Sequence, residues 1–454
     1  MKLLYALFVL SLLLFPVWAP AQTTGAVDPT VIGNPGPVTV PKYERAILNG
    51  AISPNVPANS RELCPNGRGL QQNETSIVVS GDVVVVAFND ARGGPSACPD
   101  DHAAVGWAYS LDAGKTFTDG GGLPFPRDFN NGDPWLGVSP DGTTFYLTGL
   151  WRGFQGLGFY RGGVVNNQLV WSDPVIVSFP AGNPFMDKEA FAVDPNSGTI
   201  YLCYTDFRDG TKIKATRSLD GGDTWLDPVA VSNGGSQGSF PAIDGLGTVY
   251  VAHQQGGMMR ITRSTDLGDS FQQVAVFPFR TRGVPAMDRS SDFPQVAVDT
   301  SGGDRDGWVY VVWHSISDEN VIRPYITHSE DGGETWTDPI PVNTDDTDAE
   351  HWWPSVSVDA LGNVNVVFLD RRLNPGTALT DLFYAQSTDG GYSFIDMRAS
   401  DVSGDWRGIR YDPGFTYAGD YIRAISSGTS VYAAWTDARN GDPDIYFTRI
   451  ETGK

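Results

Sequence analysis

The chain has 454 residues with 31 basic and 53 acidic side chains, so its formal net charge is −22. Such a surface repels nucleic acid and anionic membranes, which excludes functions that depend on a basic footprint, and it favours neutral or basic partners. An anionic substrate would need a local basic pocket. Three cysteines are too few for a scaffold built from disulfides.

The N-terminal residues have the features of an export signal. Lys2 supplies the positive charge, residues 3–18 form an apolar run, and Ala19-Pro20-Ala21 is a small-residue cleavage site. We expect residues 1–21 to be removed near Ala21 and the mature protein to be secreted, either extracellular or periplasmic. No later stretch approaches about 20 uninterrupted apolar residues, so no membrane insertion is expected.

The cysteines show no metal-site spacing. Cys64 and Cys98 flank a predicted hairpin and either pair after export or stay free. Cys203 lies in the apolar run Tyr201-Leu202-Cys203-Tyr204, which favours an inert thiol in a buried strand.

Five segments share the pattern Ser-x-Asp-x-Gly-x-Thr/Ser-Trp/Phe. They begin at Ser110, Ser218, Ser264, Ser329 and Ser387. In each, a short Asp side chain can accept backbone N–H groups in a tight turn, Gly takes the positive-φ position, and the aromatic residue packs beneath. We refer to these segments as the Ser-x-Asp turns, and we expect each to lock a hairpin.

The spacing of the turns predicts the architecture. Successive starts are 108, 46, 65 and 58 residues apart, so the first gap spans two periods of about 55 residues with one turn missing. That period suits a four-stranded propeller blade. Seven strand pairs rich in Val, Tyr, Phe and Trp occur in the same phase, which predicts an all-β, seven-bladed β-propeller, with six or eight blades as alternatives.

The seventh unit ends with a strand at residues 444–448 and lacks a fourth. Residues 36–40 resemble the outer-strand segments 227–231 and 338–342, so we predict that residues 38–40 complete the last blade and close the ring. The expected organisation is therefore a signal peptide (1–21), an N-terminal segment with the closing strand (22–72) and the blades (73–454), in one domain.

In a closed propeller, ligands usually meet the loops at one mouth of the central channel, so the starts of the first strands are the informative positions. They carry acidic and aromatic residues: Glu74, Asp133, Asp187, Lys188, Glu189, Asp292, Glu350, His351, Trp352, Tyr417, Asp420 and Tyr421. This rim suits sugar hydroxyls or a cation. Alternatively, these residues solvate the rim or pair with neighbouring blades.

The second strands end in a repeated Asp-x-Arg, which supplies Arg92, Arg208, Arg372 and Arg439. Converging arginines could hold a carboxylate through bidentate hydrogen bonds. A motif repeated in four blades is also explained by structural ion pairs between blades.

Two loops gather carboxylates that could bind a hard cation such as calcium. One contains Asp299, Asp304 and Asp306, and the other contains Asp345, Asp346, Asp348 and Glu350. Neither has the EF-hand spacing, so solvated acidic loops are the alternative. No cofactor is required by any motif, because zinc-type histidine spacing, P-loops, dinucleotide fingerprints and nucleophile elbows are absent from the sequence.

The Ser-x-Asp turns, together with strands such as Tyr204-Thr205-Asp206-Phe207-Arg208, resemble those of the sialidase superfamily, also called BNR-repeat or Asp-box proteins. The resemblance covers essentially the whole mature chain. It implies a propeller whose turns lie away from the catalytic mouth. In catalytic members it implies three arginines that hold a carboxylate, a tyrosine nucleophile assisted by a glutamate, and an aspartate acid/base. The chain departs from those members: it lacks an Arg-Ile-Pro motif near the first strand, and its blade count is seven rather than six.

Position in the repeat then gives a candidate set. Tyr417 would be the nucleophile, Glu189 its base, and Asp133 or Asp292 the acid. The four Asp-x-Arg arginines, with His351 and Trp352, would bind substrate.

Three functions stay open. The first is a secreted glycan-active enzyme, such as a sialidase-like glycoside hydrolase acting on acidic glycans. The second is a non-catalytic propeller that binds glycans or proteins, and the third is a structural module. We expect a monomer whose partner is a glycan or glycoconjugate.

Overall fold

Antiparallel strands make up the regular structure of the computed structural model, which describes residues 52–60, 72–90, 105–123, 132–152, 154–177, 185–280, 282–407 and 417–452. Contacts divide the chain into Met1–Glu44 and Arg45–Lys454, and every described residue belongs to the second unit. Within the described residues there is no helix, and therefore none long and apolar enough to cross a membrane. The predicted signal peptide, Cys64, Cys98 and Arg92 lie outside the described residues.

Seven sheets form the blades, and each uses its strands in sequence order from the axis outward, except that the last takes its outer strand from the N-terminal side. Blade 1 consists of β2 (Gln72–Ser80), β3 (Val83–Asp90), β4 (Val105–Ser110) and β5 (Thr118–Gly122). Blade 2 consists of β6 (Trp135–Val138), β7 (Phe145–Trp151), β8 (Gly156–Val165) and β10 (Val175–Val177). Blade 3 consists of β11 (Met186–Val193), β12 (Ile200–Asp206), β13 (Lys212–Ser218) and β14 (Val229–Ala230). Blade 4 consists of β15 (Ser236–Ile243), β16 (Val249–Gln255), β17 (Met258–Ser264) and β18 (Gln272–Pro278). Blade 5 consists of β19 (Gln295–Val298), β20 (Val309–Ile316), β21 (Ile322–Ser329) and β22 (Ile340–Pro341). Blade 6 consists of β23 (His351–Val358), β24 (Val364–Asp370), β25 (Leu379–Ser387) and β26 (Ile395–Arg398). Blade 7 is β28 (Arg423–Ser427), β29 (Ser430–Asp437), β30 (Asp444–Glu451) and β1 (Val56–Pro57), while β9 (Gln168–Trp171) and β27 (Gly404–Asp405) add to β8 and β25.

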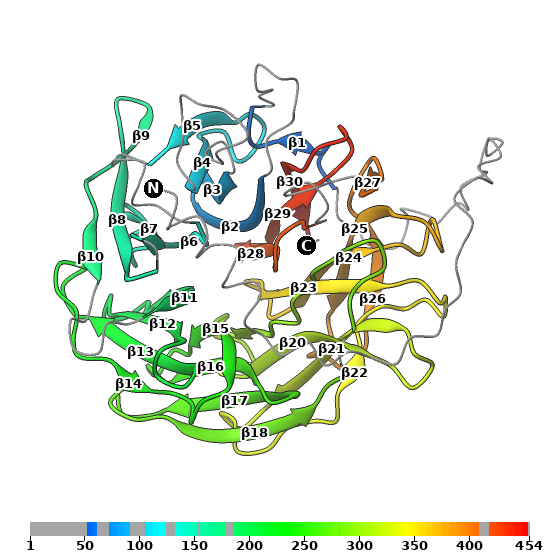
Figure 1. Cartoon of the computed structure of the whole chain (residues 1–454). Coiled ribbons are helices and arrows are strands. Elements are labelled where there is room, and N and C mark those ends of the chain that lie inside the picture. Colours follow the sequence, from blue (N-terminus) through cyan, green and yellow to red (C-terminus); the bar gives the residue numbers. More distant parts are fainter. Residues whose placement is uncertain are drawn as a thin grey trace. The chain divides into compact units, whose positions relative to one another are not determined.

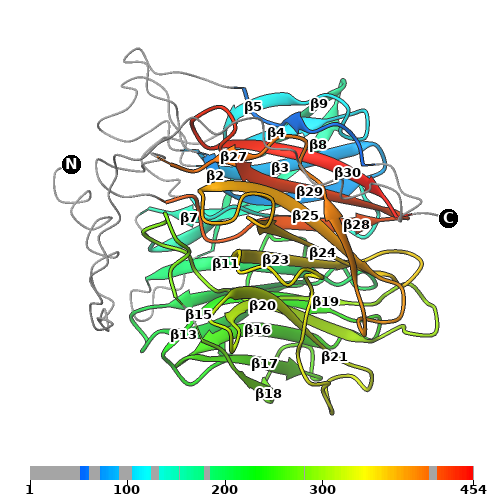
Figure 2. The ribbon, with the colours of Figure 1, turned by 90° about the vertical axis from the view of Figure 1, so that its right-hand side faces the viewer.

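The first strands contact one another in a closed ring, in the order β2, β6, β11, β15, β19, β23 and β28, and β28 contacts β2 again (Figure 1). In Figure 2, strands β16, β20 and β24 of consecutive blades run in the same general direction across the view. The predicted all-β, seven-bladed propeller is confirmed.

The last blade is closed by an N-terminal strand, but not by the segment that the sequence indicated. Val56 and Pro57 of β1 pair with Phe447 and Tyr446 of β30, and Ile52 forms a bridge with Ile450. The prediction that residues 38–40 fill this outer position is therefore wrong, and those residues lie outside the described part. The pairing satisfies the otherwise open edge of β30.

The hydrophobic core lies between neighbouring blades. Phe447 of β30 packs against Phe117 of blade 1 with ring centroids 5.0 Å apart, and Phe159 of β8 packs against Trp225 of blade 3 at 5.1 Å. Both Phe117 and Trp225 are the aromatic residues of Ser-x-Asp turns. Cys203 of β12 is also buried in this core as a free thiol, as predicted.

The Ser-x-Asp turns lock the hairpins after the third strands, as predicted. In the turn of blade 3, Gly222 N–H donates to Ser218 Oγ at 2.8 Å, and Thr224 donates from its N–H to Asp220 Oδ1 at 2.9 Å. The other four turns repeat these bonds. Because strands alternate in direction, these turns lie at the opposite end of the blades from the starts of the first strands.

The glycines of one turn provide a stability test. Gly221 and Gly222 both have positive φ, 71° and 94°, but an added Cβ at Gly222 would lie 2.3 Å from the Phe159 ring, whereas at Gly221 the nearest atom is Tyr146 OH at 3.6 Å. We expect Gly221→Ala to cost about 1–2 kcal/mol from backbone strain alone. Gly222→Ala should add about 1–3 kcal/mol from overpacking. Urea unfolding checks both variants, and equal losses would contradict the role of the Phe159 contact.

Candidate active site

The first strands of several blades begin with a backbone irregularity. Pairing shifts register between Asn73 and Ser76 in β2 and between Asp187 and Ala190 in β11. Glu74 and Lys188 lie in these two gaps, with φ of 54° and 52°. A residue held in this conformation leaves the regular alternation of strand side chains, so the bulge re-aims it. In this way side chains from different blades meet at the ring axis.

Lys188 is the centre of this meeting point. Its Nζ lies 2.9 Å from Glu74 Oε2, 3.0 Å from Asp133 Oδ2 and 2.9 Å from Asp420 Oδ2, and all four side chains are buried. The carboxylates come from blades 1, 2 and 7, so one ammonium group joins four blades. Although burial opposes ionisation, the attraction of Asp133, Asp420 and Glu74 raises the pKa of Lys188 well above its usual value.

Tyr417 lies against the same carboxylates. Its hydroxyl donates to Glu74 Oε1 and lies 3.1 Å from Asp420 Oδ2. The Arg289 guanidinium, which pairs with Asp420, stands 5.1 Å from the centre of the Tyr417 ring. Burial, with Asp420 and Glu74 nearby, raises the pKa of Tyr417 well above its usual value. The Tyr417 side chain is therefore a neutral hydrogen-bond donor with a carboxylate acceptor in place.

Carboxyls outnumber cations in this cluster. Glu74, Asp133, Asp187, Glu189 and Asp420 are set against Lys188 and Arg289. Burial raises the pKa of the first four carboxyls. Burial also acts against ionisation of Asp420, but Arg289 and Lys188 hold its pKa well below the usual range. The cluster therefore keeps protons at a pH where surface carboxyls have lost them, and such groups can act as general acids.

Glu189 is the least satisfied of these groups. It is 2% exposed, and neither of its carboxyl oxygens has a hydrogen-bond partner on another described residue. Burial first, and then the charge of Asp133, raises its pKa well above the usual value. A buried carboxyl without partners is costly when ionised, so the environment of Glu189 favours its protonated form.

An aromatic layer lies next to the Lys188 cluster along the ring axis, with the centre of the Tyr421 ring 5.7 Å from Lys188 Nζ. Trp135 of β6 contacts Phe240 of β15 with centroids 5.0 Å apart, and Tyr421 lies 6.1 Å from Trp135 and 5.8 Å from Phe240. Phe293 belongs to the same buried cluster. These rings come from blades 2, 4, 5 and 7 and form an apolar floor beneath the charged cluster.

Three of the four predicted catalytic residues belong to the cluster. Tyr417 lies beside Lys188 and its acidic partners, whereas the hydrogen-bond acceptor of its hydroxyl is Glu74 rather than Glu189. Asp292, the other predicted acid, contacts His314 Nε2. The sequence placed Glu74, Lys188 and Asp420 on the rim without giving them roles. Arg289, in the segment between β18 and β19, had no sequence signal at all.

Two of the Asp-x-Arg arginines, Arg372 and Arg439, pair with aspartates of their own surroundings rather than with the Tyr417 cluster. The Nε of Arg372 lies 2.7 Å from Asp370 Oδ2, and its Nη2 lies 2.7 Å from Asp396 Oδ2. Arg439 pairs in the same way with Asp437 at 2.8 Å and with Asp401. Both arginines serve as structural ion pairs, which was the alternative interpretation of the motif.

The remaining predicted binding residues have separate environments. Arg208 is exposed, and its backbone N–H donates to Asp206 Oδ1 at 3.1 Å. His351 is fully buried, with Nε2 2.7 Å from Asp345 Oδ1. Trp352 is also fully buried, beneath the Arg371 guanidinium at 4.8 Å. His351 and Trp352 are therefore closed to a ligand in this conformation.

The predicted calcium residues are not arranged as a cation site. Asp299 is buried and accepts the Ser301 N–H, while Asp304 and Asp306 are exposed. Within the described residues, one set of three possible ligands does come together, namely Asp345, His351 and Asp370. Arg372 lies 3.2 Å from Asp345 Oδ1 and 2.7 Å from Asp370 Oδ2, so its guanidinium already supplies the positive charge there. This donor set does not fit a metal ion.

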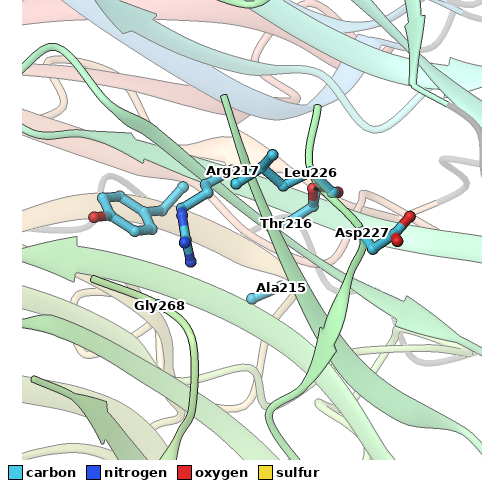
Figure 3. A pocket seen from close by; sticks show the side chains of 7 residues that line it. Ala215, Thr216, Arg217, Leu226, Asp227 and Gly268 are labelled. Carbon is cyan, nitrogen blue, oxygen red and sulfur yellow. Dashed lines mark hydrogen bonds between the residues drawn. The ribbon is translucent and has the colours of Figure 1, made fainter. Parts of the chain in front are cut away.

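Two surface hollows lie elsewhere on the described chain. One, between blades 3 and 4, is lined by residues that include Tyr201, Arg217 and Gly268 and has a volume of about 10 Å³, enough for about one water (Figure 3). The other is an open groove of about 420 Å³ beside the Ser-x-Asp turn of blade 5, lined by residues that include His328, Glu330 and Trp336. Neither includes residues of the Lys188 cluster.

Comparisons with known proteins show likeness in structure but not in sequence. No family model and no curated protein match the chain. A protein of unknown function from Dyadobacter fermentans DSM 18053 is 16% identical over 88% of this chain and 99% of that chain, with a TM-score of 0.48. Trypanosoma rangeli sialidase in complex with 2,3-difluorosialic acid is 13% identical over 88% of this chain and 59% of that chain, with a TM-score of 0.46. The Penicillium chrysogenum α-L-arabinanase complexed with arabinobiose is 12% identical over 88% of this chain and 99% of that chain, with a TM-score of 0.45. Likeness at this level carries no inference about activity, so function must be inferred from the site itself.

Removing the central ammonium group should destabilise the fold. Lys188→Met leaves Glu74, Asp133 and Asp420 facing one another without a cation, and we expect a loss of about 3–5 kcal/mol at neutral pH. Lys214→Met is the matched control. Lys214 pairs with Asp206 and Asp209, but its side chain is 20% exposed, so a loss of at most about 1 kcal/mol is expected. Urea unfolding measures both, and equal small losses would contradict a structural role for Lys188.

Glu189 should make stability depend on pH. Its folded-state pKa lies above the ordinary value of 4.5, so its stabilising contribution is complete below that value and is lost as pH rises through the folded pKa. We expect Glu189→Gln to gain stability relative to the wild type over that rise, by up to about 1.4 kcal/mol per pH unit. Urea midpoints between pH 4.5 and 8 provide the measurement, and parallel curves for the two proteins would contradict it.

Proposed function

We propose that the chain is a glycoside hydrolase whose reaction centre is Tyr417 with Glu74. The observation that carries this proposal is the hydrogen bond from the Tyr417 hydroxyl to Glu74 Oε1, at the start of the first strands and beside carboxyls with raised pKa. A nucleophile bonded to its base, with a protonated acid nearby, is the arrangement that covalent catalysis requires. The likeness of the Ser-x-Asp turns to Asp-box proteins supports the same class.

The proposed reaction has two steps. Tyr417 Oη attacks the anomeric carbon while its proton passes to Glu74, and the bond from that carbon to the leaving oxygen breaks as a protonated carboxyl donates to the oxygen. Asp133 and Glu189 are the candidate donors, because burial raises the pKa of both. In the second step water adds to the same carbon as the bond from that carbon to Tyr417 Oη breaks. The proton of the water returns to the carboxylate donor, and the released Tyr417 phenolate recovers its proton from Glu74. Glu74 is suited to the task because a raised pKa makes its carboxylate a stronger base.

The roles of the other groups follow from their contacts. Arg289 over the Tyr417 ring stabilises phenolate character as the proton leaves. Lys188 holds Glu74 in place through both of its oxygens, at 3.0 and 2.9 Å. We propose further that the protein is exported and acts on an extracellular or periplasmic glycan, on the basis of the N-terminal signal pattern and the acidic surface.

A second candidate is a non-catalytic glycan-binding propeller. The observation that favours it is that Lys188 contacts three carboxylates at once, which fixes groups that a reaction would have to move. A glycan array that shows binding, combined with no turnover of the bound glycans, would select this function.

Activity assays on variants test the hydrolase proposal. Across a panel of aryl glycosides that includes an aryl sialoside, we expect turnover by the wild type. Tyr417→Phe, which keeps the ring but removes the hydroxyl, should lower kcat/KM by about 10²–10⁴-fold or more. Tyr392→Phe is the control, because Tyr392 belongs to the Ser-x-Asp turn of blade 6 at the other end of the blade. No turnover of any substrate, or full activity in Tyr417→Phe, would reject the proposal.

A further inference from the structure

Arg423 is a cation of the inner ring with no acidic partner. Its side chain donates from Nη1 to Ser76 Oγ and to the Leu136 carbonyl, both at 2.8 Å, and its guanidinium stacks on Trp135 at 4.0 Å from the ring centre. It forms no salt bridge with any described residue, although the chain carries 53 acidic residues. The three groups that contact this guanidinium, namely Ser76, the Leu136 carbonyl and Trp135, are neutral.

Two nitrogen groups of the guanidinium, Nε and Nη2, are not used by these hydrogen bonds. Both hydrogen bonds use Nη1, and the Nε and Nη2 groups have no hydrogen-bond partner among the described residues. Arg423 is half-buried, so these donors still reach solvent. The Nε and Nη2 groups of an arginine point in parallel and match the two oxygens of a carboxylate.

Arg423 lies beyond the Tyr417 cluster along the axis. On β28 it follows Tyr421 of the aromatic layer, and its partners Ser76 and Leu136 follow Glu74 and Asp133 on the neighbouring first strands. All first strands start at the same end, so Arg423 is further from that end than the cluster.

We propose that Arg423 is an anion site on the propeller axis, separate from the Tyr417 cluster, that binds a carboxylate through its Nε and Nη2 groups. A half-buried guanidinium without an acidic partner carries a charge that its neighbours do not balance, and a bound anion would compensate it. Trp135 offsets only part of this charge. Burial lowers the pKa of Arg423 to about 9, and no nearby carboxylate counters this shift. A bound carboxylate would restore the missing charge, and it would tie blades 7, 1 and 2 together through a group that already bridges them.

Thermal stability in acetate, compared with chloride at equal ionic strength and pH, tests the site without reference to catalysis. We expect Tm of the wild type to rise saturably with acetate but not with chloride, because a ligand that binds only the folded state stabilises it by mass action. Arg423→Lys keeps the charge but lacks the parallel donors, so at least half of the acetate-specific shift should be lost. Arg423→Gln should abolish the shift. Arg263→Gln removes an arginine that pairs with Glu334 and should respond as the wild type does.

Titration calorimetry with acetate and with glucuronate separates a free small carboxylate from one carried by a sugar. Binding of either that is lost in Arg423→Lys supports the site, and a preference between them identifies the source. Equal responses of the wild type to acetate and chloride, or an unchanged response in both Arg423 variants, would reject the proposal and leave Arg423 as a cross-blade hydrogen-bond donor. Because no readout depends on turnover, these outcomes are independent of the hydrolase proposal.

Discussion

The contact on which the axis depends is one ammonium group, that of Lys188, held between carboxylates from three other blades. Without it, Glu74, Asp133 and Asp420 would repel one another in a region from which water is largely excluded, and such repulsion is weakly screened there. With it, the first strands of blades 1, 2, 3 and 7 are connected by charge as well as by packing. The same contact fixes Glu74 and Asp420, and these two residues hold the Tyr417 hydroxyl. The contacts of Lys188 therefore both join these blades and position the side chains of the candidate site.

The architecture was predictable because its information is local. Each Ser-x-Asp turn is made within a few residues of chain, so Asp220 and Thr224 bond in the structure as their spacing in the sequence required. The count of blades follows from the spacing of such turns. The period implied that one blade lacks such a turn, and blade 2 turns instead at Asn166 and Asn167, with φ of 51° and 61°. The closing strand was misplaced because β1 is only two residues long, so pairing with β30 rather than any sequence pattern defines it.

The site was predictable only as far as the repeat determines it. Periodicity brings the starts of the first strands together, and so it grouped Tyr417, Glu189 and Asp133 correctly. It could not show which carboxylate Tyr417 meets, because that depends on the bulge that turns Glu74 with a positive φ of 54°. The Asp-x-Arg motif misled for the opposite reason. It is local enough for each arginine to bond the aspartate two residues before it, as Arg372 and Arg439 do, and this consumes the donors that a substrate carboxylate would have needed.

Charge is distributed unevenly along the axis, and this unevenness bears on the ligand. At the Tyr417 level, carboxyls exceed cations and some must stay protonated, which suits proton donation to a leaving oxygen but opposes an anionic group in the same place. At the Arg423 level, a cation has no acidic partner among the described residues. A glycan carrying a carboxylate would therefore meet repulsion from the cluster that is proposed to cleave it. The aromatic layer of Trp135, Phe240 and Tyr421 lies between the two levels, so attraction at Arg423 does not relieve that repulsion. Under the proposed hydrolase mechanism an uncharged sugar suits the Tyr417 level, and Arg423, which has no acidic partner among the described residues, lies at a different part of the axis.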